Sequence, residues 1–183
     1  MISLFTESYF REAARDISET YIKTFSNNLS SYTDFDIFLS YNIADKTVVK
    51  GIFEVLSKMG FRVYLDFVID PQLNRANVTK QTALVIQNRL KHSQSLIYAA
   101  SINAAMSRWM PWELGYVDGH KQKCAILPVG SNPQVTYKRS EYLLLYPYIS
   151  NINGKMHIRN SDLDIGEAVS YTHLRAHETD QYL

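Results

Sequence analysis

The sequence predicts a single α/β domain whose core is a five-stranded, mainly parallel sheet with helices on both faces. Short runs rich in β-branched and aromatic residues alternate with segments of helical period between 34 and 148. Strands that alternate with helices in this way are typical of a parallel sheet with right-handed crossovers. The chain has 183 residues, 46% of them hydrophobic and 20% charged, which suits one well-packed domain rather than two large ones.

Each element of this domain has its own signal. Strands are expected in the apolar runs 35–40, 61–65, 95–99, 124–129 and 143–146. Helices are expected over 45–59, from 77 or 79 to about 92, and over 107–120. Gly60 ends the first helix, and Asn77 or Thr79 caps the second. Pro111 lies in the first turn of the third helix, where proline is tolerated. A long loop is expected over 67–75.

The first 33 residues predict a helix and a linker ahead of the main domain, which we place at 34–165. From 6 to 27, apolar residues recur at steps of three and four, as on one face of an amphipathic helix. The stretch 26–34 is rich in Ser and Asn and is typical of a linker. We favour a helix that docks on the flank of the domain. A helix that packs against a partner chain is the alternative.

Residues 169–179 predict a non-native tail. Over eleven consecutive positions they resemble the in-frame translation of a common sequencing adapter. We therefore expect the natural chain to be truncated near Ala168 and exclude 169–183 from fold reasoning, as a fusion scar would be. His173 and His177 lie four residues apart and mimic a metal pair on a helix, but a tail that was never selected gives this spacing no weight.

Composition excludes several classes of protein. The net charge is +1 and the basic residues are scattered along the sequence, which argues against a nucleic-acid or membrane partner. No apolar run approaches the ~20 residues that cross a bilayer, and we expect no signal peptide. The single cysteine fits a reducing compartment, so we expect a cytoplasmic protein. His92 and His120 are isolated, so we expect no metal. No glycine loop for a phosphate occurs, and we expect no bound cofactor.

Function is expected where the parallel strands end, because open α/β sheets bind ligands at the carboxyl ends of their strands. In this sequence those ends are Ser40 with Tyr41, Asp66, Ser101 and the loop that leads to Trp109.

Three motifs carry a resemblance to a known family. The run Phe-Asp-Ile-Phe-Leu-Ser-Tyr at 35–41 resembles the first strand of Toll/interleukin-1 receptor (TIR) domains, and 61–66 resembles their second strand, which enters the BB loop. The run Ser-Arg-Trp-Met-Pro-Trp-Glu at 107–113 resembles the serine–x–tryptophan–x–x–x–glutamate signature of TIR domains that cleave NAD+. The resemblance spans about 34–129 and implies a flavodoxin-like fold. The loop 67–77 departs from the pattern, because it contains Pro71 and lacks the glycine of many animal BB loops.

The resemblance implies an NAD+ glycohydrolase or cyclase with Glu113 as the catalytic carboxylate, in bacterial immune or antiphage signalling. Breaking the nicotinamide–ribose bond leaves positive charge on the ribose, which an ionised carboxylate stabilises. Glu113 comes early in its expected helix, where the dipole favours an anion, and Trp109 precedes it by four residues on the same face. Ser40, Tyr41 and Asp66 are the further substrate-binding candidates. The partners implied are NAD+, further copies through the loop 67–77, and other TIR or effector proteins.

Other interpretations stay open. An acid early in a helix is commonly a dipole partner only, and tryptophans are commonly core residues. A non-enzymatic TIR–TIR interaction module is one alternative function, although such adaptors commonly lack the glutamate. A nucleoside deoxyribosyltransferase-like enzyme, which also uses a glutamate, is another. A two-component receiver domain fits less well, because its paired acids follow its first strand, whereas Asp34 and Asp36 flank the start of this one.

Overall fold

The computed structural model of the chain describes residues 2–15, 34–73, 79–132, 141–159 and 167–168. The second half of the expected N-terminal helix, the linker after it, Asn77 and the tail 169–183 lie outside the described residues.

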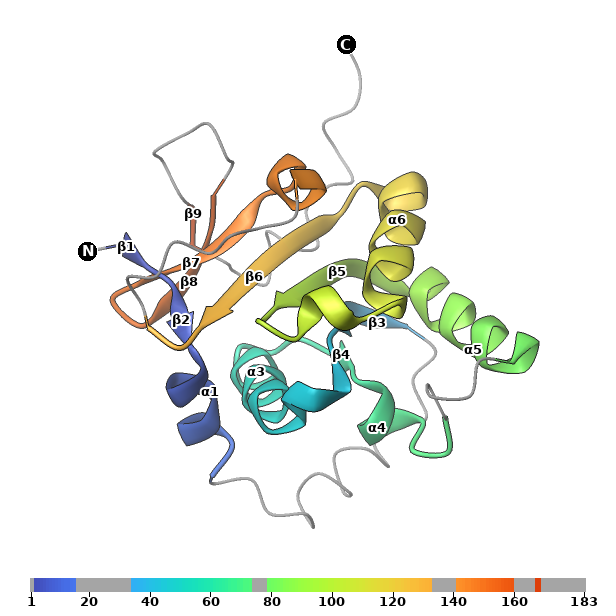
Figure 1. Cartoon of the computed structure of the whole chain (residues 1–183), viewed down its shortest axis with the longest axis horizontal. Coiled ribbons are helices and arrows are strands. Elements are labelled where there is room, and N and C mark those ends of the chain that lie inside the picture. Colours follow the sequence, from blue (N-terminus) through green and yellow to red (C-terminus); the bar gives the residue numbers. More distant parts are fainter. Residues whose placement is uncertain (1, 16–33, 74–78, 133–140, 160–166, 169–183) are drawn as a thin grey trace.

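A parallel sheet forms the centre of the molecule, as the alternating pattern predicts (Figure 1). Its strands are β4 (Val63–Tyr64), β3 (Phe35–Ser40), β5 (Ser93–Ala100), β6 (Cys124–Gly130) and β7 (Tyr148–Ile152), side by side in that order. In chain order this is 2-1-3-4-5, the order of flavodoxin-like folds. The predicted fold class is confirmed. Every residue of β3 is buried, as expected for a parallel strand that is covered on both faces.

The sheet continues beyond the five predicted strands and has nine among the described residues. Two antiparallel strands, β8 (Lys155–Arg159) and β9 (Glu167–Ala168), extend it past β7. The prediction of a strand over 143–146 is wrong. Glu141–Leu145 form a 3₁₀ helix, in which Leu143 is buried while Leu144 and Leu145 are exposed. The fifth parallel strand begins only after Pro147.

The main helices lie near their predicted positions. They are α3 (Lys46–Lys58), α5 (Lys80–Lys91) and α6 (Trp109–Lys121), with short 3₁₀ helices at Ile43–Asp45 and Ala104–Met106. Thr79 caps α5, since its hydroxyl accepts from the backbone N–H of Thr82 at 3.1 Å. Gly60 follows α3 at φ 92°, a left-handed conformation that glycine adopts without strain. The stretch predicted as a long loop from 67 instead begins with a short helix, α4 (Asp66–Ile69).

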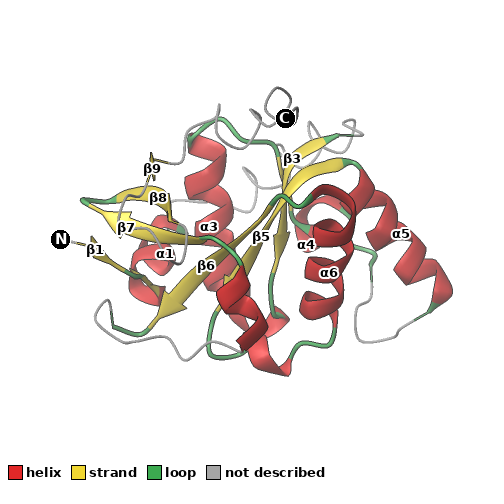
Figure 2. Ribbon diagram, turned by 90° about the horizontal axis from the view of Figure 1, so that it is seen from above, coloured by secondary structure: helices red, strands yellow, loops and turns green. Residues whose placement is uncertain are grey.

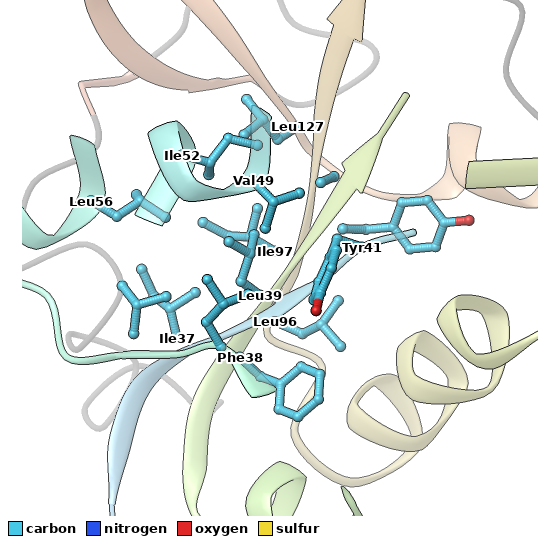
Figure 3. Close-up of a cluster of buried hydrophobic side chains, with 14 of the residues drawn as sticks. Ile37, Phe38, Leu39, Tyr41, Val49, Ile52, Leu56, Leu96, Ile97 and Leu127 are labelled. Carbon is cyan, nitrogen blue, oxygen red and sulfur yellow. The ribbon is translucent and has the colours of Figure 1, made fainter. Parts of the chain in front are cut away.

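Helices cover both faces of the sheet. In the view from above, α3 and α1 lie on one side and α5 and α6 on the other (Figure 2). Side chains alternate along β3, so Ile37 and Leu39 point toward α3 while Phe38 points away from it (Figure 3). On that opposite face Phe38 stacks on Tyr64 of β4, with the ring centroids 4.9 Å apart.

The N-terminal segment belongs to the sheet instead of preceding it. Strand β2 (Phe5–Thr6) pairs in parallel with the end of β6, and β1 (Ile2–Ser3) pairs antiparallel with the end of β7. Helix α1 (Glu7–Ala13) follows and buries Phe10 completely. It packs against α3 at Gly51, where a Cβ would lie 1.8 Å from the carbonyl oxygen of Phe10. The first residues therefore dock on the flank of the domain through strands as well as a helix.

Candidate active site

The carboxyl ends of β3, β4 and β5 bring most of the predicted site residues to one edge of the sheet. Because side chains alternate along a strand, Ser40 at the end of β3 points to the same face as Phe38, which is the face that α6 covers. Helix α6 crosses this edge with Trp109 as its first residue and Glu113 as its fifth. The sheet thus brings together residues that are 73 positions apart in the chain.

Glu113 and Ser40 form the centre of the site. The Ser40 hydroxyl donates to Oε2 of Glu113 at 2.6 Å, and both side chains are fully buried. A buried carboxylate requires such donors, because it has lost its hydrogen bonds to water. Ser40 therefore orients the Glu113 carboxylate. The argument from the helix dipole is weaker than predicted, because Glu113 lies in the second turn of α6 and not in the first.

Tyr41 and Asp66 form a second buried pair beside the first. The Tyr41 hydroxyl donates to Oδ1 of Asp66, which also accepts from the backbone N–H of Phe67 at 2.7 Å. Phe67 lies edge-on to the Tyr41 ring, with centroids 5.7 Å apart, and the ammonium of Lys46 lies 4.8 Å from the Phe67 ring. Asp66, the first residue of α4, therefore links the segment that follows β4 to Tyr41, the residue that follows β3.

Sequence reasoning missed a third acidic group at this edge. Asp45 is buried and accepts from the hydroxyl of Ser101, at the end of β5, and from Nδ2 of Asn103 at 2.6 Å. Asn42 in turn donates to the backbone carbonyl of Asn103 at 2.7 Å. These bonds join the loops that follow β3 and β5. The signal was the acid five residues after the first strand, which we assigned only to the start of a helix.

Trp109 is partly buried and packs against the core, with its ring 5.4 Å from that of Trp112. It begins the helix that carries Glu113, one turn before it, as the spacing predicts. Its predicted role in binding a substrate stays a prediction.

Within the described residues no cluster of three His, Cys, Asp or Glu side chains has the geometry of a metal site. In the same part of the chain no helix has the length and apolar character of a membrane span.

The flavodoxin-like sheet thus places the glutamate of the signature motif, Glu113, beside Ser40 at the end of the first strand. No protein-family model matches the chain. The probable 3′ cyclic ADP-D-ribose synthase ThsB′ of Bacillus cereus (strain MSX-D12) is 42% identical over 140 residues, which are 76% of this chain and 70% of that protein. The putative cyclic ADP-D-ribose synthase TIR2 of Cytobacillus dafuensis is 29% identical over 92 residues, which are 50% of this chain and 24% of that protein. This chain belongs to the bacterial TIR-domain family that includes ThsB′.

Proposed function

We propose that this protein cleaves the nicotinamide–ribosyl bond of NAD+ and closes the remaining ADP-ribose into a cyclic product. One observation carries the proposal: the signature glutamate, Glu113, is buried and oriented by Ser40 at the end of the first strand. The names of ThsB′ and TIR2, which describe them as cyclic ADP-ribose synthases, support it.

The chemistry needs one well-placed carboxylate. The bond between C1 of the ribose and the pyridinium nitrogen breaks, and its electron pair leaves with neutral nicotinamide. The ribose then carries oxocarbenium-like positive charge, which the Glu113 carboxylate stabilises more strongly in a dry site than in water. No general acid is required, because the leaving group is already cationic in NAD+. An acceptor hydroxyl then forms the new C–O bond and releases its proton.

The acceptor decides between a cyclase and a hydrolase. Water gives ADP-ribose, whereas a ribose hydroxyl of the same molecule gives an O-linked cyclic ADP-ribose, such as the 3′ form in the name of ThsB′; each reaction also yields nicotinamide and one proton. Glu113 and Ser40 are both 0% exposed, so the carboxylate lies where bulk water is excluded. Exclusion of water favours the internal hydroxyl. NAD+ must therefore open the loops around Tyr41 and Asp66 before it reaches Glu113.

The test is chromatography of NAD+ and its products with the parent chain and two matched variants. Glu113→Gln is expected to lower turnover at least about 100-fold. Asp118→Asn, which changes another acid of α6, is expected to keep the activity. Loss of NAD+ without a cyclic product would retain the cleavage and refute the cyclisation. Equal turnover by the parent and Glu113→Gln would refute the assignment of Glu113. No turnover by a folded parent at any concentration would favour the adaptor alternative.

Ser40 acts as a positioning residue in this proposal. Ser40→Ala removes the donor to Glu113 and is expected to lower kcat about tenfold or more while KM changes little, because the ribose charge develops only in the transition state. Ser40→Thr, which keeps a hydroxyl, serves as the conservative variant. A change confined to KM would instead indicate that Ser40 only helps to bind NAD+.

We further propose that the chain associates with itself through the loop 67–77 and signals in bacterial antiphage defence in the cytoplasm, as its family resemblance implies. Specific activity is then expected to rise steeply with protein concentration. Pro71 is exposed, and Pro71→Arg should flatten that rise while leaving the melting temperature unchanged. Activity per molecule that stays constant over the whole concentration range would refute self-association. Phage challenge of cells that carry the parent or Glu113→Gln tests the defence role.

A further inference from the structure

A second polar pocket lies at the amino-terminal edge of the sheet, opposite the edge that holds Glu113. Its volume is about 470 Å³, within the range of small-molecule sites. The residues that line it precede or begin β3, β4, β5 and β6, which run parallel, so their starting points meet at one edge. None of the roles discussed so far uses this pocket.

The fold brings basic residues that are far apart in the sequence together around this pocket. Its charged and titratable lining residues are Asp34, Arg62, Lys91, His92, Lys121 and Lys123. Four of these carry a permanent positive charge and one is a carboxylate. Ser93 and Gln94 complete the wall, and no apolar side chain lines it among the described residues. A wall of this composition fits a small, highly charged anion.

The ion pairs of the basic lining residues show how much of their positive charge is left without a neutralising carboxylate. Arg62 forms an ion pair with Asp36 at 3.1 Å, and Oδ1 of Asp34 accepts from Nδ1 of the His92 ring at 2.9 Å. Within the described residues, no ion pair joins Lys91 or Lys123 to a carboxylate. Among the described residues, these two lysines are thus left without a neutralising acid.

A structural role at the end of a helix accounts for Lys121 but not for Lys123. Lysines are favoured at helix C-termini, and the Lys121 ammonium donates to the backbone carbonyls of Leu90, Lys91 and Ser93 at the end of α5. That role uses the Lys121 charge but does not involve Lys123, which lies two residues beyond α6. Burial lowers the pKa of the Lys121 ammonium, and the charge of nearby Lys123 lowers it further. An anion between the two lysines would relieve their repulsion.

We propose that this pocket binds a small, soluble anion that carries two or more phosphate groups, held by Lys91, Lys121 and Lys123. A phosphate offers several acceptor oxygens to ammonium donors, and a diphosphate balances the charge of the two lysines that lack an acidic partner. The concave shape and limited volume favour a small molecule over a polymer. The site is separate from the NAD+ site and its existence does not depend on the proposed reaction.

The test is calorimetric titration of the full chain with inorganic pyrophosphate as the probe. The double variant Lys91→Gln/Lys123→Gln is expected to weaken binding at least about tenfold. Lys155→Gln, which changes an exposed lysine on β8, serves as the matched control and should bind like the parent. Lys91→Arg/Lys123→Arg, which keeps both positive charges, should retain binding. This result would show that the Gln variant binds weakly because it has lost charge and not because substitution at these positions disrupts the fold. Added salt should weaken binding by the parent.

Several outcomes would overturn the proposal. The first is an absence of pyrophosphate binding by the parent at millimolar concentration. The second is binding that the double Gln variant retains, because the probe would then occupy another site. The third is binding to phosphatidylglycerol vesicles that pyrophosphate does not displace, which would indicate a lipid surface instead of a soluble ligand.

Discussion

Replacing Gly51 by alanine tests how firmly the N-terminal segment is fixed to the domain. Gly51 lies in α3, and a Cβ built on it would lie 1.8 Å from the carbonyl oxygen, 2.5 Å from the carbonyl carbon and 2.9 Å from the Cα of Phe10. These are backbone atoms of α1, so no side-chain rotation relieves the clash. Ordinary contact begins near 3.4 Å, and α1 must therefore move by roughly 1.6 Å.

The magnitude follows from two opposing effects. An alanine stabilises the interior of a helix by about 1 kcal/mol relative to glycine. Overpacking against rigid backbone costs about 1–3 kcal/mol, and a displaced α1 also loses part of the ~2 kcal/mol that burial of Phe10 contributes. We expect a net loss of about 2 kcal/mol in the free energy of unfolding. For a chain of this size, that lowers the melting temperature by about 6 °C.

The assay is thermal unfolding followed by circular dichroism, with Gly119→Ala as the control. Gly119 lies in α6, and a Cβ there meets nothing within 4 Å, so this variant should be neutral or slightly stabilised. If Gly51→Ala melted at the same temperature as Gly119→Ala, the close packing of α1 on α3 would be refuted, and with it the docking of the N-terminal segment.

Two further predictions concern buried ionisable groups. Asp70 accepts from Nε and Nη2 of Arg89, both at 2.9 Å, and is almost fully buried; Asp70→Asn should cost about 2 kcal/mol by thermal unfolding, because it leaves the Arg89 charge without its acid. The exposed pair Arg15–Glu12 is the control, and Glu12→Gln should change stability by less than about 0.5 kcal/mol; equal effects would contradict the reasoning. Burial raises the pKa of the Cys124 thiol to about 12, so the folded chain should react far more slowly with a disulfide reagent at pH 8 than the unfolded chain. The same shift favours the protonated thiol, so its stabilisation is complete below pH 9 and falls as the pH rises from 9 toward 12; Cys124→Ala should lose less stability over that range, and an unchanged pH profile would refute this.

The central sheet was predictable because its signals are local. The apolar run at 35–40 matches β3 residue for residue, and Thr79 caps α5 as its hydroxyl and position predict. The 3₁₀ helix Glu141–Leu145 was not predictable from its three leucines, since composition does not reveal that only Leu143 of the three is buried. Strands β1 and β2 are two residues each, too short for any periodicity to indicate.

Most residues of the candidate site were predictable, but their pairing was not. The end of a strand points to Ser40, Tyr41 and Asp66 as residues near a site, and the signature motif points to Glu113. Which hydroxyl meets which carboxylate depends on the crossing of α6 over β3, which no local pattern contains. Asp45 was missed for the same reason, because its partner Ser101 lies 56 residues away.

The pairing of the N-terminal strands also affects how the chain folds during synthesis. Phe5 lies beside Val129, and Ile2 beside Ile152, so these early residues cannot pair until partners much later in the sequence have been made. Contacts this distant in sequence slow folding, because a long loop must close before they form. The ends of β6 and β7 thus lack their strand partners until the N-terminal segment pairs with them. An unpaired strand end readily forms backbone hydrogen bonds with another chain. A bulky fusion at the N-terminus would prolong that interval.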